Sequence, residues 1–291
     1  MLRTVPDDGL AGRPLLVSLV YSTSEGSTSL GGVQLSSSVE DYLKTIWKLG
    51  SRGDRVTLTA VAGARAVSPP SASAMLHRLE EAALVERGPA AEVYLTPLGR
   101  VEALRVVRRH RLLEAFLTQV CGLHWDEVHD EAEVLEHALS ARLEARIDEL
   151  LGHPSRDPHG DPIPLPEAAQ LEEDWHEPLQ GTPEGAAFRV ERVSDRDPAA
   201  LRHVATVGVV PGVTLRVGRQ DPFGGPLWVS VQDAADLIPL APGLVEIVYG
   251  RVTPFPDPGA GVTVAVDAPT SEHPNGVSVV EGDRRVSAAV G

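Results

Sequence analysis

The chain has 291 residues, of which 42% are hydrophobic and only 4% aromatic, and it carries a formal net charge of −15. Its length predicts two or three domains, and its hydrophobic fraction is that of a globular protein with a sizeable core. Cys121 is the single cysteine, which excludes an internal disulfide and a zinc cluster built from cysteines. Since no apolar run is long enough to span a bilayer and no secretory leader is recognisable, we expect a cytoplasmic protein that does not contact membranes.

The acidic charge is distributed unevenly along the chain. Residues 36–110 contain 11 Lys and Arg against 8 Asp and Glu, whereas residues 111–152 contain 3 against 10. A strongly negative total argues at first sight against nucleic acid as a partner, but the first of these segments is mildly basic. The total therefore does not exclude DNA binding by that segment.

The first part of the chain has the pattern of a small helical module with a hairpin. Residues 1–35 are rich in Gly, Ser and Thr and lack periodicity, which predicts a disordered leader. Ser68 is typical of a helix N-cap and Pro69 of a first helical residue. The predicted elements after the leader are a helix at about 37–49, a short helix at 57–66 ending in a tight turn, a helix from Pro69, two short strands at 84–87 and 92–96, and a helix from Thr96 to about Cys121.

This order of elements is typical of a winged helix-turn-helix. The alternative is a small helical domain that happens to carry a hairpin. The outward face of the helix from Pro69 is small and polar, which suits close approach to a DNA groove, and arginines flank it for phosphate contacts. Its few long polar side chains predict limited direct reading of base edges. The residues that we expect to contact DNA are Arg65, Ser68, Pro70, Ser71, Ser73 and Arg78.

Residues 129–137 have the pattern of a metal-binding helix. The polar side of a helix predicted from about 125 to 151 carries His129, Glu133, Glu136 and His137. These residues fall at i, i+4, i+7 and i+8, while apolar residues form the other side. Two imidazoles and two carboxylates on one stripe can hold a divalent cation, and this donor set favours Mn(II) or Fe(II), with Zn(II) also compatible. The alternative is a solvated acidic helix whose histidines are incidental.

Three further residues have side chains that can join this stripe. His110 and Glu114 lie at i and i+4 on the helix that follows the hairpin, and Asp41 lies near the start of the first helix. Taken singly, His110 is more simply explained as a helix-end histidine and Asp41 as an N-terminal helix carboxylate. Together they predict one site built from Asp41, Glu133, Glu136 and His137. A second site would use His110, Glu114 and His129.

After residue 152 the pattern changes twice. Residues 153–187 are rich in proline and acidic residues, which predicts a partly ordered linker. Short strands are then predicted at 188–193, 214–217, 227–231 and 245–248, with a short helix at 198–207. These strands indicate a small β-barrel. Residues 254–291 have Pro, Gly and Ser punctuation without a clear core and predict a loosely ordered tail.

Five short segments spread over about 37–164 together form a specific pattern. They are residues 40–46 (EDYLKTI), 95–99 (LTPLG), 109–114 (RHRLLE), 128–137 (VHDEAEVLEH) and 158–164 (PHGDPIP). The chain resembles, through these segments, the diphtheria toxin repressor and manganese transport regulator family of metal-dependent transcriptional regulators. The β region resembles, more weakly, the SH3-like domain that many members carry.

The resemblance implies roles for the candidate ligands. By position, Asp41, Glu133, Glu136 and His137 correspond to the family's principal metal site, and His110, Glu114 and His129 to its second site. Members with glutamate at the position of Glu133 favour manganese, whereas those with cysteine favour iron. Members with paired ions have a carboxylate where this chain has Lys44, so two separated sites are the expectation. Asp195 is the candidate ligand from the SH3-like region.

The sequence as a whole predicts a mainly α protein with a small β domain that is not an enzyme. We expect a regulator that binds Mn(II), with Fe(II) as the alternative, acts as a homodimer on a double-stranded DNA operator and represses metal-uptake genes when the metal is bound. The competing classes are a di-metal carboxylate enzyme, which needs Glu-x-x-His on two helices, and a metal-buffering protein on a helical bundle. The predicted domains are a leader (1–35), a winged helix-turn-helix DNA-binding domain (36–107), a metal-binding and dimerisation domain with linker (108–180), an SH3-like domain (181–253) and a tail (254–291).

Overall fold

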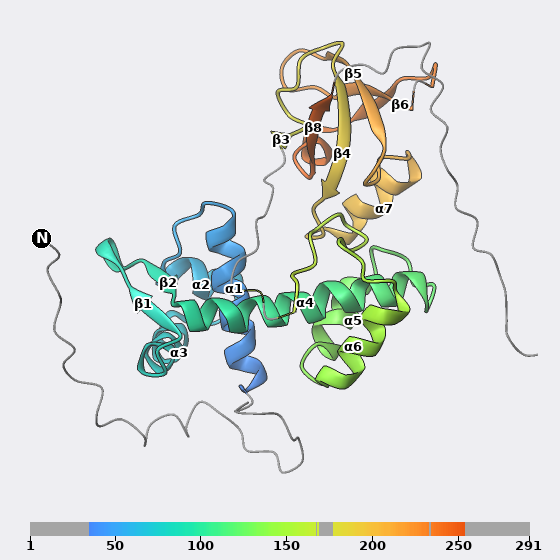
Figure 1. Ribbon diagram of the computed structural model, residues 1–291. Helices are drawn as coiled ribbons and strands as arrows, with labels where there is room; N and C mark the ends of the chain where they lie inside the picture. Colours follow the sequence, from blue (N-terminus) through green and yellow to red (C-terminus); the bar gives the residue numbers. More distant parts are fainter. Residues whose placement is uncertain (1–34, 167, 169–176, 233, 254–291) are drawn as a thin grey trace, which may run out of the picture. The chain divides into compact units, whose positions relative to one another are not determined.

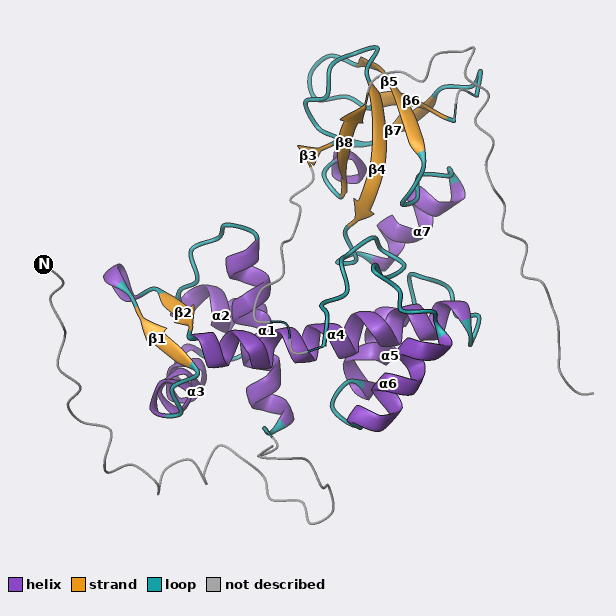
Figure 2. Ribbon diagram, viewed as in Figure 1, coloured by secondary structure: helices purple, strands orange, loops and turns teal. Residues whose placement is uncertain are grey.

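The computed structural model describes residues 35–166, 168, 177–232 and 234–253 (Figures 1 and 2). The predicted tail and, apart from Leu35, the predicted leader lie outside these residues. Two helical modules precede a β-sheet domain, which confirms the mainly α fold class with a small β domain. Among the described residues, no helix combines the length and the apolar character needed to cross a membrane.

The first module is the predicted winged helix-turn-helix. It consists of α1 (Ser37–Ser51), α2 (Leu58–Ala64), α3 (Pro69–Glu81), β1 (Val85–Arg87), a 3-10 turn (Pro89–Ala91) and β2 (Val93–Leu95). Side-chain oxygens start α2 and α3, because Thr57 accepts a hydrogen bond from Ala60 N–H and Ser68 accepts one from Ser71 N–H. The apolar faces of α1, α2 and α3 meet in one core around Leu43.

One long helix, α4 (Pro97–Gln119), links the two helical modules. Thr96 caps it, since its side chain accepts a hydrogen bond from Gly99 N–H. Leu104 joins the core of the first module. Leu112, two turns further along, lies in a second core with residues of α5 (Val128–Leu135) and α6 (Ala141–Leu150). Both cores therefore share one continuous helix, which Figure 1 shows crossing α1 and lying next to α5.

The single helix predicted from about 125 to 151 is wrong. The chain instead forms α5 and α6, with a break over residues 136–140. Ser140 explains the break, because its side chain caps α6 by accepting a hydrogen bond from Leu143 N–H. Glu136 is therefore the C-cap of α5, and His137 lies in the turn beyond the helix.

The C-terminal domain is an open sheet rather than the predicted barrel. Its antiparallel strands are β3 (Glu177–Pro178), β4 (Ala187–Val193), β5 (Thr214–Gln220), β6 (Leu227–Val231), β7 (Ile238–Leu240) and β8 (Val248–Thr253), in the order β3-β8-β4-β5-β6-β7. Within the described ranges, β3 and β7 are the two edges. The predicted helix at 198–207 is α7 (Pro198–Thr206). The strand predicted at 245–248 is wrong, because Pro242 opens a short helix, α8 (Pro242–Val245), and β8 begins only afterwards.

The predicted linker begins with a closely packed turn at residues 157–161. Val193 N–H of β4 donates a hydrogen bond to the carbonyl oxygen of His159 at 2.9 Å. Gly160 approaches β4 so closely that a Cβ atom there would lie 2.0 Å from the carbonyl oxygen of Glu191. The indole of Trp125, from the α4–α5 loop, stacks on His159 and belongs to the core of the sheet domain. The turn and this indole therefore join the sheet domain to the metal-binding helices.

Replacing Gly160 with alanine should lower the free energy of unfolding by more than the cost of placing alanine at a positive φ. Gly160 (φ 92°) and Gly181 (φ 84°) both have left-handed backbones, but nothing lies within 4 Å of a Cβ at Gly181. Gly181→Ala should therefore cost about 1–2 kcal/mol. Gly160→Ala should cost that amount plus about 1–3 kcal/mol for the displaced backbone. Chemical denaturation measures both, and equal losses of unfolding free energy would contradict the close contact.

Candidate metal centre

Packing of α1, α4 and α5 brings the predicted ligands together. Asp41 lies on α1, His110 and Glu114 lie on α4, and the others lie on α5 or in the turn after it. Each of the seven predicted ligands falls in at least one group of donor atoms that lie within 4.8 Å of one another. Side chains far apart in the sequence therefore converge between these helices.

The first group joins the two helical modules and consists of Asp41, Glu136 and His137. Asp41 Oδ1 lies 3.0 Å from His137 Nε2, and Glu136 Oε1 lies 3.5 Å from the same nitrogen. On the other side of the ring, His137 Nδ1 lies 2.6 Å from Oε2 of Glu40, a residue that the sequence did not single out. A carboxylate behind an imidazole fixes the orientation of the ring. Nε2 of His137 therefore faces the other two donors of the group.

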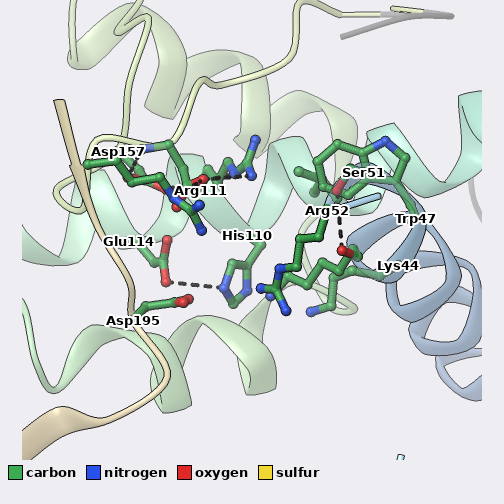
Figure 3. A pocket seen from close by; sticks show the side chains of 13 residues that line it. Lys44, Trp47, Ser51, Arg52, His110, Arg111, Glu114, Asp157 and Asp195 are labelled. Atoms are coloured by element: carbon green, nitrogen blue, oxygen red, sulfur yellow. Dashed lines mark hydrogen bonds and ion pairs between the residues drawn. The ribbon is translucent and has the colours of Figure 1, made fainter. Parts of the chain in front are cut away.

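The second group consists of His110, Glu114, His129 and Asp195. Nε2 of His110 lies 3.1 Å from Glu114 Oε1, and Nδ1 of His129 lies 3.3 Å from both Glu114 Oε1 and Asp195 Oδ2. Figure 3 shows Glu114 and Asp195 beside the ring of His110. Burial by itself would lower the pKa of His110, but the charge and hydrogen bond of Glu114 raise it to about 9. The metal-free group therefore holds a proton.

Glu133 lies between these two groups rather than in the first. Its Oε1 is 2.7 Å from Lys44 Nζ and 3.8 Å from His110 Nδ1. Lys44 Nζ also lies 2.5 Å from Glu136 Oε1. Burial favours the neutral form of Glu133, but the positive charges of Lys44 and His110 outweigh it and lower the pKa of this carboxyl to about 2. Glu133, Glu136 and His110 thus form a third group, which already contains an ammonium.

A further group, which the sequence did not predict, consists of the buried residues Glu114, Asp157 and His159. His159 Nε2 donates to the carbonyl oxygen of Trp125 at 2.8 Å. Its buried Nδ1 has no hydrogen-bond partner in the part of the chain that the structure describes, and lies 3.8 Å from Glu114 Oε2. Burial, together with the charges of Asp161 and Glu114, raises the pKa of Asp157 to about 8. The sequence did contain a signal for this group, because His159 lies in the segment PHGDPIP at 158–164, which resembles the family. That resemblance did not identify His159 as a ligand.

The donor chemistry of these groups fits a divalent metal ion. All four groups contain only carboxylate oxygens and imidazole nitrogens, and Cys121 is exposed and belongs to none of them. Such donors suit Mn(II) and Fe(II). His159 adds a buried imidazole nitrogen that lies 3.8 Å from Glu114 Oε2, which is a further donor of the same kind.

Five of the six predicted DNA-contacting residues lie between the end of α2 and the first turns of α3, and Arg78 lies in the last turn of α3. The exposed ones are Ser68, Pro70, Ser71 and Ser73. Arg78 is half-buried on the same helix. Arg65 differs from the rest, because its Nη2 donates a hydrogen bond to Oδ2 of Asp41 at 2.6 Å. One predicted DNA contact is therefore bonded to a predicted metal ligand.

Three family models match successive parts of the chain. Residues 34–93 match the N-terminal DNA-binding domain of the iron dependent repressors, residues 96–165 match their metal binding and dimerisation domain, and residues 177–251 match the FeoA domain. A winged helix-turn-helix followed by groups of metal-ligating side chains defines the class of metal-responsive DNA-binding regulators.

Several known repressors are similar to this chain. The iron-dependent repressor IdeR of Mycobacterium tuberculosis is 31% identical over 233 residues, which cover 80% of this chain and 90% of that protein. The diphtheria toxin repressor of Corynebacterium efficiens is 37% identical over 164 residues, covering 55% and 71%. A solved manganese-dependent transcriptional repressor in complex with manganese has a TM-score of 0.68 and 41% identity, covering 74% of this chain and 100% of that one.

The chain belongs to the diphtheria toxin repressor and manganese transport regulator family of metal-dependent repressors. It is a metal-dependent DNA-binding transcriptional repressor and not an enzyme. The resemblance carried by the five short sequence segments is thereby confirmed. The di-metal enzyme and the metal-buffering protein are set aside, because both matched helical domains are repressor domains.

Metal binding at the second group should release protons. Although burial favours the neutral ring, Glu114 holds the pKa of His110 at about 9, so a cation must displace a proton at neutral pH. Mn(II) affinity should therefore rise between about pH 6 and pH 8, by about tenfold per unit for each proton displaced. Titration calorimetry in two buffers of different ionisation enthalpy counts the protons, with His203→Ala on α7 as a control that should not alter the count. Metal uptake without proton release near neutral pH would contradict this account.

Proposed function

We propose that this chain is a Mn(II)-responsive repressor that binds the operators of metal-uptake genes as a homodimer. The observation that carries the proposal is the first group, which joins Asp41 of the DNA-binding module to Glu136 and His137 of the metal-binding module. Oxygen and imidazole donors without thiolate support Mn(II). The likeness to a manganese-dependent repressor at 41% identity supports the same metal. Fe(II) is the alternative, because the similar IdeR is an iron-dependent repressor.

The proposed switch is the strength of the connection between the two helical modules. When bound, a divalent ion supplies positive charge that the donors of both modules share. Asp41 moves with α1 and, through their common core, with α3, whereas Glu136 and His137 move with α5. Joining these donors selects one arrangement of the modules from those that the free chain populates. In a dimer, that arrangement sets the distance between the two α3 helices, which must match successive major-groove faces.

Exposed apolar side chains on the metal-binding module support the homodimer. Val134 on α5 is 73% exposed, and Leu143 and Leu150 on α6 are 52% and 64% exposed. These residues lie within the matched dimerisation domain. Apolar side chains on the outer faces of two neighbouring helices are suited to burial against a second copy of the chain.

We expect two separate ions per chain rather than a pair that shares ligands. Lys44, whose side chain is 3% exposed, contacts both Glu133 and Glu136. Its ammonium already neutralises the carboxylates between the first and second groups, and a metal ion beside it would meet a like charge at short range. Lys44 thus takes the place of an ion in the third group, and a cation at the first site would have to draw Glu136 away from this ammonium, because Oε1 of Glu136 contacts Lys44 as well as facing His137. Glu133 as a direct ligand stays a prediction.

Asp41→Asn should uncouple metal binding from DNA binding. The amide keeps the size of the carboxylate but removes the charge that the DNA-binding module contributes to the first group. In the parent protein, operator DNA should tighten Mn(II) binding by about 5- to 150-fold, which is the usual range of coupling between two sites. Mn(II) titrations with and without an operator, selected from genomic fragments with metal-loaded protein, measure this factor. Asp54→Asn, in the exposed loop after α1, is the control. The proposal fails if Asp41→Asn keeps the parent's full coupling.

Lys44→Gln should increase the number of Mn(II) ions that the chain binds. Without the ammonium, Glu133, Glu136 and His110 remain as a group of donors within 4.8 Å of one another, and the only charge left to offset the carboxylates within this group is the exchangeable proton of His110. Lys48→Gln, one turn further along α1, removes the same charge from a residue that is not within ion-pair distance of these carboxylates. Equilibrium dialysis with elemental analysis gives the stoichiometry. If both variants bind as many ions as the parent, Lys44 does not hold the place of an ion.

A further inference from the structure

The two oxygens of the Asp41 carboxylate face different parts of the molecule. Oδ1 lies 3.0 Å from His137 Nε2, in the first metal-ligand group. Oδ2 accepts a hydrogen bond from Arg65 Nη2 at 2.6 Å. Arg65 is the C-cap of α2, and Ser68, the N-cap of α3, follows three residues later. One carboxylate therefore connects the metal-ligand group with the turn of the helix-turn-helix.

The guanidinium of Arg65 is held in place on the protein rather than extended into solvent. Its side chain is 28% exposed, and that of Asp41 is 18% exposed. The guanidinium carbon lies 5.8 Å from the centre of the Tyr42 ring, so the aromatic face supports it from one side. Its Nε is buried and has no hydrogen-bond partner among the described residues. The bond to Asp41 is thus made by a side chain whose approach is fixed by its packing.

We propose that Arg65 is a positioning residue of the metal centre. By occupying Oδ2, it holds the Asp41 carboxylate with Oδ1 turned toward Glu136 and His137, the orientation that a cation at the first group needs. The inference rests on the proposed function in one respect, namely that Asp41 is a metal ligand. Partners that hydrogen-bond to a ligating carboxylate fix its geometry, and their loss typically lowers metal affinity by about 10- to 100-fold. A charge-assisted bond of this kind also has a defined direction.

This role differs from the phosphate contact that the sequence suggested for Arg65. A phosphate contact acts only when DNA is present. Its loss makes the plot of log affinity for DNA against log salt concentration less steep by about one unit. A positioning residue acts on Mn(II) binding before any DNA is added. The two roles therefore separate in a measurement on the DNA-free protein, where only the positioning role predicts a change.

The experiment is a Mn(II) titration of the full chain without DNA, for the parent, Arg65→Gln and Arg65→Lys. Arg65→Gln should weaken binding at the first site by about 10- to 100-fold. Arg65→Lys should recover part of the loss, because an ammonium can still donate to Oδ2 but lacks the planar fork of the guanidinium. Arg55→Gln, an exposed arginine whose guanidinium pairs with Glu92, is the control and should leave the affinity unchanged. Circular dichroism tests whether each variant is folded. If Arg65→Gln does not fold, the affinity of Arg65→Lys is compared with that of the parent instead.

A double-mutant cycle with Asp41 distinguishes positioning from a general loss of stability. If Arg65 acts through Asp41, Arg65→Gln should add no further loss of Mn(II) affinity to Asp41→Asn, whereas independent effects would add. Parent-like affinity of Arg65→Gln without DNA, or full additivity in the cycle, would overturn the inference. A smaller salt dependence of DNA binding in that case identifies a phosphate contact instead. If Asp41→Asn itself retains the parent's Mn(II) affinity, the proposed ligand role of Asp41 fails, and the inference about Arg65 fails with it.

Discussion

The structure depends on the neutralisation of carboxylates that its helices bury. Glu114 is 1% exposed and Glu136 is 0% exposed, and an uncompensated buried charge is strongly destabilising. In the metal-free protein the compensating charges are the Lys44 ammonium, which contacts Glu136, and the protonated ring of His110, which lies between Glu136 and Glu114. The two differ in kind, because the proton can leave when another cation arrives, whereas the ammonium is part of the chain. The fold therefore places a permanent cation, the Lys44 ammonium, and exchangeable protons on His110 and His159 among the same acids.

The acidic residues also connect the three domains. The first group includes Asp41 of the DNA-binding module. Arg65 donates a hydrogen bond to Asp41, and Glu40 contacts His137 on the side of its ring that faces away from Asp41. Through Asp195 and the turn at 157–161, the second group reaches the sheet domain. Each group thus ties a different neighbour to α4 and α5. In the proposed switch, an ion in one group would therefore not replace an ion in the other, because the two groups lie at different interfaces.

The features that could be predicted from the sequence are those encoded locally. Ser68 and Thr96 cap helices where their positions indicate, and residue type and spacing singled out His129 and His137. The break before Ser140 was missed, because residues 136–140 are compatible with a helix and only the competing cap ends it. The contact of Glu133 with Lys44 depends on the packing of α1 against the other helices, which spacing within one helix does not contain. His159 was missed for the same reason, because its neighbours come from α4 and a distant loop.

Trp125 shows that the boundary of a domain in the sequence is not the boundary of its packing. The matched FeoA region begins at residue 177, yet the core of the sheet is completed by an indole from the loop between α4 and α5. Exchanging the sheet domain between relatives at that boundary would leave this indole facing a surface that did not evolve with it. A change of side-chain volume at residue 125 would therefore disturb the packing of the sheet core. The sheet domain therefore packs as a continuation of the metal-binding module rather than as a separable unit.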